Sequence, residues 1–400
     1  KLYDALGIRT LDDLEAAAEA GQIQEVSGFG AKTEQNILEG IDFARQSRER
    51  QLLGDARPLA DEALSYLADV DAADRWEVAG SIRRWRATIG DVDGLVATEE
   101  PECVVESFTD WDRVEDVIEA GTTKASTRVA GVRIDLRTVV PEEFGSALQY
   151  FTGSKDHNIT LRNYAIDREV KLNEYGAFDV SDVENPDAGQ RVGDRVGGET
   201  EESMYEALDL PWVPPEMRED RGEIEAAANG ELPDPIDEGD VRGDLHTHTE
   251  WSDGDVTIEE LARGAVEYGH DYLCISDHAT GPGMVGGVGL EDDELREQRD
   301  EIRSVDDDLD DIDLLAGVEA NVDAEGGISV ADDVLADLDL VVASPHSALD
   351  QGTDAATERL IAAVEHPHVD VLGHPSGRLL NRREGMTFDV DAVVEAATDA

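Results

Sequence analysis

Four short apolar runs in the second half of the sequence each lead into a residue that can bind a metal ion. The runs are 272–275, 314–315, 340–343 and 369–372, and the residues that follow them are His278, Glu319, His346 and His374. Helical patterns separate the runs, and strands that alternate with helices predict parallel βαβ units. Because a barrel places the carboxyl ends of parallel strands on one side, we expect these four side chains to converge there.

A further block of metal-binding side chains, at 244–254, precedes the first run. His246 and His248 are two residues apart, so in a strand they point to the same face. Imidazole pairs at this spacing bind transition metals well, and Asp253 follows closely in the sequence. An isolated histidine is more often a core or surface residue, and we give that reading to His270, His366 and His368. We also expect Asp277 to orient its neighbour His278.

The segment 80–93 carries a different pattern, built from oxygen ligands. Asp91 and Asp93 share one strand face if this segment is extended, so two hard divalent cations could bind beside them and hold a nucleoside triphosphate. The upstream Gly-Ser pair and arginines supply backbone N–H groups, a hydroxyl and guanidinium groups, all of which bind phosphate oxygens. An Asp-x-Asp pair alone is weak evidence in an acidic chain, but the whole segment is more specific.

A third carboxylate belongs to an alternating strand pattern at 132–140. Ile134 and Leu136 would face one side, and Asp135, with arginines on either side of it, the other. Pairing of this strand with the first would complete a cage of three carboxylates, and Asp135 could also deprotonate an attacking hydroxyl. The alternative is an edge strand with solvated, salt-bridged charges.

These two segments resemble the palm signature of family X DNA polymerases, a branch of the nucleotidyltransferases. The block 150–158, followed by Arg162, resembles the Tyr-Phe-x-Gly-Ser motif of that family at the junction of palm and thumb, and 173–176 is similar to a further thumb element. Tyr150 and Phe151 could alternatively be an aromatic pair in the core. Their position in the sequence after the three carboxylates favours the family motif.

The resemblance implies roles for individual residues. The metal-binding carboxylates, which would hold Mg²⁺ or Mn²⁺, are Asp91, Asp93 and Asp135. The nucleotide-binding residues are Gly80, Ser81, Arg84, Gly90, Tyr150, Phe151, Gly153 and Asn158. Arg133 and Arg162 are expected to contact DNA. In this scheme a primer 3′-hydroxyl attacks the α-phosphate in line.

The segment 24–37 reads as a helix, a glycine hairpin and a second helix, and it resembles a helix–hairpin–helix DNA-binding motif. Gly28 and Gly30 would let backbone N–H groups meet a DNA phosphate, and Lys32 would add positive charge. The alternative is an ordinary glycine turn between helices. Members of this family usually carry another small domain before this point, sometimes with lyase activity, and we assign no lyase chemistry here.

The block that begins at residue 244 resembles a PHP (polymerase and histidinol phosphatase) domain, a distorted β/α barrel. The resemblance implies a metal site, for Mn²⁺ or Zn²⁺, formed by His246, His248, Asp253, His278, Glu319, His346 and His374. The family closes this cluster with a late Asp-x-His motif that the sequence given does not contain. We therefore expect the barrel to be incomplete and the sequence to be truncated at both ends.

Composition limits the setting in which such a protein could meet DNA. The formal net charge is −61, and only five of the 33 basic residues are lysine. Acid is spread through the whole chain, as in salt-adapted cytoplasmic proteins, and at 1 M salt the Debye length is only about 3 Å. Basic residues nevertheless gather at 81–90 and 121–140. There is no apolar run long enough to span a membrane, no signal peptide, and no cysteine framework, which favours a cytoplasmic location.

We expect a multidomain chain of α+β and α/β type. The predicted parts are helical fingers with a helix–hairpin–helix at 1–55, a nucleotidyltransferase palm with a mixed sheet at 56–140, an α+β thumb at 141–222, a linker at 223–240, and an incomplete PHP barrel at 241–400. The two cysteines, Cys103 and Cys274, fall in different parts.

The favoured function is template-directed, gap-filling DNA repair synthesis, with a 3′–5′ exonuclease or phosphoesterase activity from the PHP domain in the complete protein. The partners would be gapped or primer–template DNA and deoxynucleoside triphosphates, with the protein as a monomer. Three alternatives remain open at this point: a PHP phosphoesterase whose palm binds DNA but is inactive, a DNA-binding scaffold, and a template-independent nucleotidyltransferase.

Overall fold

The protein is described by a computed structural model that covers residues 2, 6, 8, 11–24, 26, 29–30, 37, 50–283 and 288–400. The chain forms two compact units, Lys1–Pro235 with Leu380–Arg382, and Ile236–Leu379 with Arg383–Ala400. Near the start, helix α2 (Leu11–Glu19) packs through Ala17 and Ala18 in a small apolar cluster that also contains Ile23.

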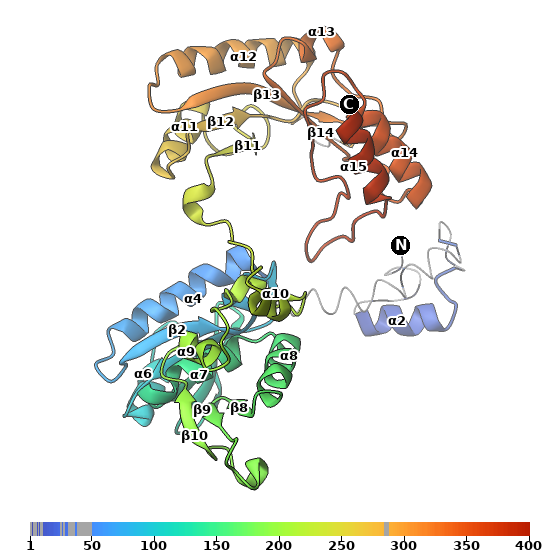
Figure 1. The fold of residues 1–400 in the computed structure, drawn as a ribbon. Coiled ribbons are helices and arrows are strands. Elements are labelled where there is room, and N and C mark those ends of the chain that lie inside the picture. The colour runs from blue at the N-terminus through green and yellow to red at the C-terminus, as the bar shows by residue number, and fades with distance from the viewer. Residues whose placement is uncertain are drawn as a thin grey trace. The chain divides into compact units, whose positions relative to one another are not determined.

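The region expected to form the palm contains a five-stranded sheet in the order β2-β4-β7-β6-β5, of which Figure 1 labels β2. The sheet is mixed, as the sequence predicted. Strands β4 and β7 are parallel and the other pairs are antiparallel. Its elements are β1 (Gln51–Leu52), α4 (Leu53–Ala68), β2 (Arg75–Ala79), α5 (Gly80–Arg83), β3 (Thr88–Ile89), β4 (Val92–Ala97), α6 (Pro101–Thr109), β5 (Asp116–Ala120), β6 (Lys124–Val129) and β7 (Val132–Val139).

The two faces of this sheet differ because side chains alternate along each strand. On β7, Ile134 and Leu136 are buried in the core that α4 and α6 cover. Leu95 and Ala97 of β4 point to the other face, where they pack against helix α7 (Phe144–Thr152). The same alternation places Asp93 and Asp135 on the α7 face, beyond the end of this second core.

The thumb combines helices with a three-stranded antiparallel sheet in the order β10-β9-β8. Its elements after α7, which follows the turn η1 (Pro141–Glu143), are α8 (Lys155–Ile166), β8 (Val170–Asn173), β9 (Gly176–Asp179), η2 (Pro186–Ala188), β10 (Asp194–Gly197), α9 (Glu201–Glu206), η3 (Pro215–Met217) and α10 (Glu223–Asn229). Helix α8 begins where the Ser154 hydroxyl accepts a hydrogen bond from the backbone N–H of His157.

Helix α10 corrects the expected linker at 223–240. Ile224 and Ala227 are three residues apart, so they lie on one face of α10, and both are buried in the thumb core with Met204 and Tyr205. This burial fixes the segment as part of the thumb, and the extended stretch begins only after Asn229.

The second unit is a five-stranded parallel sheet whose strands follow the chain order, β11-β12-β13-β14-β15. Its elements are η4 (Glu238–Asp240), β11 (Gly243–Thr247), α11 (Ile258–Glu267), β12 (Tyr272–Ile275), α12 (Asp292–Asp307), β13 (Asp313–Asn321), α13 (Asp332–Leu335), β14 (Leu340–Ser344), α14 (Thr353–Val364), β15 (Val371–Leu372) and α15 (Val390–Asp399). The strand–helix alternation confirms the expected βαβ pattern, and the open sheet is the kind of half-barrel that a PHP domain contains.

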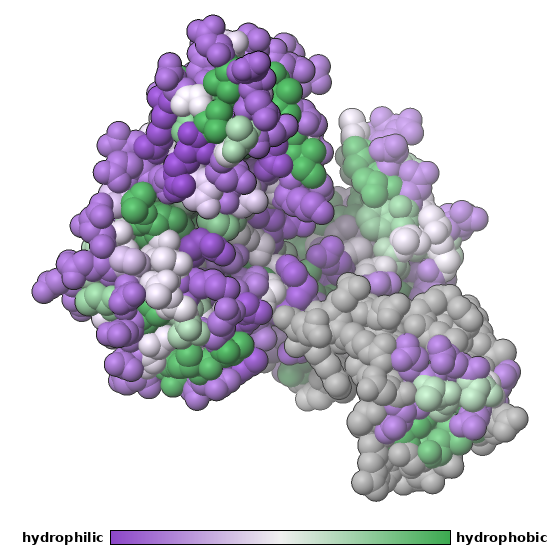
Figure 2. All heavy atoms as spheres, turned by 90° about the horizontal axis from the view of Figure 1, so that it is seen from below, coloured by the Kyte–Doolittle hydropathy of each residue, from purple (hydrophilic) through white to green (hydrophobic). Residues whose placement is uncertain are grey.

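Hydrophilic side chains predominate on the face drawn in Figure 2, with apolar patches between them. This agrees with a formal net charge of −61. Within the described part of the chain, no helix has the length and apolar character needed to cross a bilayer.

Candidate metal centres

The first candidate centre lies where two parallel strands of the palm meet. Asp93 of β4 and Asp135 of β7 are direct register partners, and Asp91 lies in the bend immediately before β4. One carboxylate oxygen from each of the three residues lies within 4.8 Å of the others. The strand pairing that the sequence suggested therefore brings the three carboxylates together.

Gly80 is required by this arrangement. Its φ of +61° is a conformation that L-residues rarely adopt, and a β-carbon built on it would lie 2.0 Å from Oδ2 of Asp93. The glycine thus allows the start of α5, with Ser81, to approach the carboxylates closely.

The carboxylates repel one another, which is the electrostatic condition for binding a cation. Burial, and then the charges of Asp91 and Asp135, raise the pKa of Asp93 from 3.8 to about 7. Asp135 is held in place because its Oδ1 accepts hydrogen bonds from Arg133 Nε at 2.8 Å and from Ser126 Oγ at 2.5 Å. Three converging carboxylates match the all-oxygen ligand preference of Mg²⁺ and Mn²⁺.

Arg83, the last residue of α5, and Arg84, which follows it, both contact residues of the thumb. Arg84, expected at the triphosphate, donates from Nε to Glu219 Oε1 at 2.8 Å, and its guanidinium also donates to the backbone carbonyl of Thr152. A phosphate would therefore have to compete with Glu219 for this side chain.

Arg83 belongs to the arginines that the sequence analysis expects to bind phosphate, but in the structure it is engaged by a carboxylate of the thumb. It binds Glu201 with two hydrogen bonds, of 2.7 and 3.0 Å, and Arg218 and Trp212 donate to the same carboxylate. Burial opposes ionisation of Glu201, but Arg218 and Arg83 outweigh it and lower the pKa of Glu201 to about 2. The signal for this network is weak in sequence, because Arg83 and Glu201 are 118 positions apart.

The remaining predicted nucleotide-binding residues lie around the junction of α7 and α8. Tyr150 and Phe151 pack edge to face at 5.1 Å, and the Arg137 guanidinium lies 4.5 Å from the Phe151 ring. Asn158 donates to the Tyr150 carbonyl at 2.8 Å, and Gly153 ends α7 with a φ of +70°. Phe151 lines the same pocket as Asp93 and Asp135, so the aromatic pair is not simply a core contact.

The predicted DNA-contacting residues lie on different elements, and only some of them are among the described residues. Arg162 is exposed on α8 and lines a thumb groove together with Tyr150, and Arg133 is exposed on β7. Gly90, which is predicted to bind the nucleotide rather than DNA, lies in the bend before Asp91. Gly30 is exposed, whereas Gly28 and Lys32 lie outside the described residues.

The second candidate centre lies at the carboxyl ends of the parallel strands β11 to β15. His246 belongs to β11 and Glu319 to β13, while His278, His346 and His374 follow β12, β14 and β15. Because the strands are parallel, their carboxyl ends meet at one edge of the sheet. The structure therefore brings together all seven predicted residues of this cluster, with His248 and Asp253 following β11.

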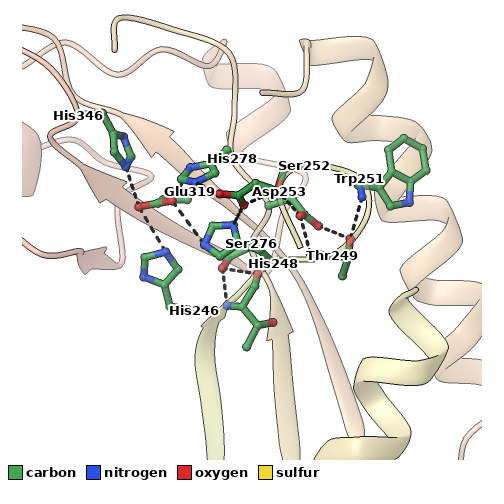
Figure 3. Close-up of polar contacts among 12 residues, drawn as sticks. His246, His248, Thr249, Trp251, Ser252, Asp253, Ser276, His278, Glu319 and His346 are labelled. Atoms are coloured by element: carbon green, nitrogen blue, oxygen red, sulfur yellow. Dashed lines mark hydrogen bonds and ion pairs between the residues drawn. The ribbon is translucent and has the colours of Figure 1, made fainter. Parts of the chain in front are cut away.

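Glu319 is the centre of this cluster and is fully buried. Figure 3 shows His246, His278 and His346 directed at its carboxylate. Nε2 of His374 lies 2.8 Å from Oε1 and Nδ1 of His278 lies 2.6 Å from Oε2, while Nε2 of His246 and of His346 each lie 3.3 Å from Oε1. Burial opposes ionisation of Glu319, but the histidines around it favour its charged form and outweigh burial, so the pKa of Glu319 is lowered.

The donor atoms form three overlapping groups, each compact enough to hold one ion. The groups are His246, Glu319 and His374; His248, Asp253 and His278; and His278, Glu319 and His346. Nδ1 of His248 is buried without a hydrogen-bond partner, as expected of an atom positioned for a metal. Imidazole nitrogens combined with carboxylates suit Zn²⁺ and Mn²⁺, so the residues fit the expected metals.

Asp277 does not orient His278 as expected. Its buried carboxylate accepts hydrogen bonds from the backbone N–H and hydroxyl of Thr249, from Ser252, and from Gln298 of α12, at 2.5–2.7 Å. Alternation along the chain turns Asp277 away from its neighbour, so it instead holds the turn that leads to Asp253.

Comparison with known proteins finds family models that match three segments of the chain. Family models match for a SAM-like helix-hairpin-helix tandem over residues 1–42, a DNA polymerase beta thumb over residues 147–219 and a PHP domain over residues 244–387. A crystal structure of Leishmania infantum polymerase beta, a ternary P/T complex, aligns with a TM-score of 0.38 and 24% identity over 55% of this chain and 91% of that chain.

Two curated relatives cover different shares of the chain. A probable phosphatase of Caldanaerobacter subterraneus subsp. tengcongensis is 34% identical over 161 residues, which are 39% of this chain and 58% of the relative. The DNA polymerase/3′-5′ exonuclease PolX of Bacillus subtilis (strain 168) is 35% identical over 401 residues, which cover 99% of this chain and 68% of that protein. With this identity over nearly its whole length, and with its thumb and PHP domains, the chain belongs to the PolX family, the family X DNA polymerases that carry a PHP domain.

Proposed function

We propose that this chain carries out template-directed, gap-filling DNA synthesis in its first unit and hydrolyses phosphoesters, as a 3′–5′ exonuclease, in its second. The observation that carries the first half is the register pairing of Asp93 with Asp135, with Asp91 beside them. The observation that carries the second half is the buried Glu319 surrounded by histidines.

In the palm, Asp91, Asp93 and Asp135 would hold Mg²⁺ or Mn²⁺. When bound, these ions supply Lewis-acid stabilisation of the negative charge that develops on the reacting oxygens. Asp135 would receive the proton of the primer 3′-hydroxyl, and Arg133 and Ser126 keep its carboxylate turned toward the site.

The nucleotide side of the reaction depends on the turn at Gly80. The backbone and hydroxyl of Ser81 would bind phosphate oxygens, and Arg84 would do so after leaving Glu219. Tyr150, Phe151 and Asn158 would contact the sugar and base of the incoming nucleotide. Arg162 would contact the template strand, which is why we favour templated over untemplated addition.

In the second unit, the three donor groups around Glu319 would hold Mn²⁺ or Zn²⁺. When bound, such ions lower the pKa of a coordinated water and so supply a nucleophile near neutral pH. Glu319 and its histidines keep the donor atoms in place, and Asp277 fixes the turn that carries Asp253.

We assign the fingers to 1–55, the palm to 56–140, the thumb to 141–229 and the PHP domain to 241–400. We also propose that the protein acts as a monomer in a cytoplasm with multimolar salt. With a net charge of −61, long-range attraction to DNA is absent, so binding would depend on short hydrogen bonds, metals and shape.

The test compares Asp135→Ala with His246→Ala in multimolar KCl with Mg²⁺ or Mn²⁺. Loss of one carboxylate ligand should reduce primer extension on gapped DNA by about 10³-fold or more and leave degradation of the 3′ end intact. His246→Ala should abolish degradation of the 3′ end and leave primer extension intact. Matched controls are Asp116→Ala, an exposed carboxylate on the same palm sheet, and His366→Ala, a histidine outside the cluster.

Extension that survives Asp135→Ala would contradict the palm assignment. Loss of both activities in either variant would contradict two separate sites. If no variant or wild-type preparation extends a primer, but degradation depends on His246, then the alternative of a phosphoesterase with an inactive, DNA-binding palm is correct.

A further inference from the structure

Asn321 lies at the end of β13, two residues beyond Glu319 and on the same face of the strand. Its side chain is completely buried, and no role follows for it from the sequence patterns. Its amide lies between two segments that carry cluster residues. One contact is to Nδ1 of His346 at 2.6 Å, and the other is to the carbonyl of Ala279, directly after His278, at 2.7 Å.

These two contacts determine the orientation of the Asn321 amide. The Ala279 carbonyl can only accept a hydrogen bond, so the NH₂ group of Asn321 must point to it. The amide oxygen then faces His346, and because this oxygen can only accept, Nδ1 of His346 must carry the proton.

The consequence for His346 is a defined tautomer. With the proton on Nδ1, the lone pair of Nε2 is free, and Nε2 is the atom that faces Oε1 of Glu319 at 3.3 Å. A histidine ligand needs this free lone pair, and the hydrogen bond made by its other nitrogen sets which tautomer is present.

The backbone of Asn321 is also fixed, independently of the side chain. Its N–H donates to the Ser329 hydroxyl at 3.0 Å, and its carbonyl accepts from the Ser329 N–H at 3.0 Å. Ser329 therefore supports the end of β13 without a hydrogen bond to the histidine ring.

We propose that Asn321 is a positioning residue that holds His346 as the Nδ1–H tautomer and joins the segments that carry His278 and His346. The proposal rests on the proposed metal-binding function of this cluster. It concerns how the site is assembled before any ion binds, so it can be tested in the metal-free protein as well.

The first experiment reads the tautomer directly. The metal-free full chain is labelled with ¹⁵N in histidine, and the ring signals of His346 are assigned by comparison with His346→Gln. The neutral ring of the wild type should show a protonated Nδ1 and an unprotonated Nε2. Asn321→Leu should lose this pattern, while Asn321→Asp, which keeps an acceptor oxygen, and Ser329→Ala should retain it.

The second experiment measures binding of Co²⁺, followed by its visible absorption. Asn321→Leu should weaken binding of Co²⁺ about 10- to 100-fold, as expected for loss of a group that orients a ligand, and Ser329→Ala should stay within a few-fold of wild type. Asn321→Asp should bind more tightly than Asn321→Leu, which separates orientation of the ring from a general loss of packing.

Two results would overturn the proposal: a wild-type His346 protonated on Nε2, or unchanged Co²⁺ affinity in Asn321→Leu. Failure of the wild type to bind Co²⁺ would instead contradict the metal site itself, and the tautomer measurement would still decide the role of Asn321.

Discussion

The two candidate centres both bring metal-binding side chains together, but one is built from carboxylates and the other mainly from histidines. In the palm, three carboxylates from two neighbouring strands and the bend before one of them lie close together, and one of them has a pKa raised to about 7 although Arg133 contacts Asp135. In the PHP domain, four strands deliver histidines around the one buried carboxylate that β13 carries, and the histidines lower the pKa of Glu319. The palm centre repels itself in the absence of ions, whereas the PHP centre is already held together by its own donors.

This difference suggests how each centre works in a cell. A site of three carboxylates offers an incomplete ligand set, which the phosphate oxygens of a nucleotide can complete, so ions and nucleotide would be held together. A site rich in imidazole can retain its ions between reactions. The following predictions test this contrast, beginning with the largest effect.

Gly80→Ala should damage only the palm centre. The new β-carbon would meet Asp93 at 2.0 Å, and a displacement of about 1 Å in a reacting group costs about 10²-fold in rate. Primer extension should fall by at least that factor, while release of phosphate or nucleotides by the PHP domain should stay unchanged. Gly54→Ala is the matched control, because nothing lies within 4 Å of its added β-carbon. Normal extension by Gly80→Ala would show that Asp93 is not held where we place it.

Asp93→Asn should make the ion-free protein more stable, and more so at high pH. Burial and the neighbouring carboxylates raise the pKa of Asp93 to about 7 in the folded chain, against 3.8 for an unperturbed aspartate, so the folded state binds more protons between these pH values. Stability of the wild type should therefore fall as the pH rises from about 4 to about 7, and the variant should escape this loss.

Thermal unfolding in EDTA at constant KCl measures this effect. At pH 8 the melting temperature of Asp93→Asn should exceed that of the wild type by about 5 °C, and the two should coincide near pH 4. A variant that is less stable than wild type at pH 8 would mean that the three carboxylates do not repel one another as the structure indicates.

Glu219→Gln should have the smallest effect, and in the direction of tighter nucleotide binding. The carboxylate of Glu219 occupies Arg84, so its neutralisation should lower the KM for deoxynucleoside triphosphates about 3- to 10-fold, with little change in kcat. Glu216→Gln, an exposed neighbour, is the control. An increased KM would indicate that Glu219 instead orients Arg84 for the phosphate.

The sequence predicted those features that depend on local spacing. The alternation at 132–139 gave the correct faces of β7, and the recurrence of histidines after apolar runs gave the ends of β12, β14 and β15. Contacts between distant residues could not be predicted in this way. Arg83 with Glu201, Arg84 with Glu219 and Asn321 with His346 each join elements that meet only in the folded chain.

Two errors have the same origin. The sequence predicts that Asp277 orients its neighbour His278. In the structure the Asp277 carboxylate faces Thr249, because successive residues of an extended segment point to opposite sides. The segment from residue 223 has the acid content of a linker, but Ile224 and Ala227 are enough to dock it as α10. Composition describes the solvent side of an element, whereas a few apolar positions decide whether it packs.

The contact between Arg83 and Glu201 limits which fragments of this chain could be active as polymerases. The turn that carries Gly80 and Ser81 is anchored, through Arg83, to a carboxylate that also binds Arg218 and Trp212 near the end of the thumb. A fragment that stopped at residue 140 would keep all three palm carboxylates, yet its Arg83 would lose both Glu201 and Thr152. We therefore expect an active polymerase fragment to extend at least through Arg218, even though all three palm carboxylates lie before residue 140.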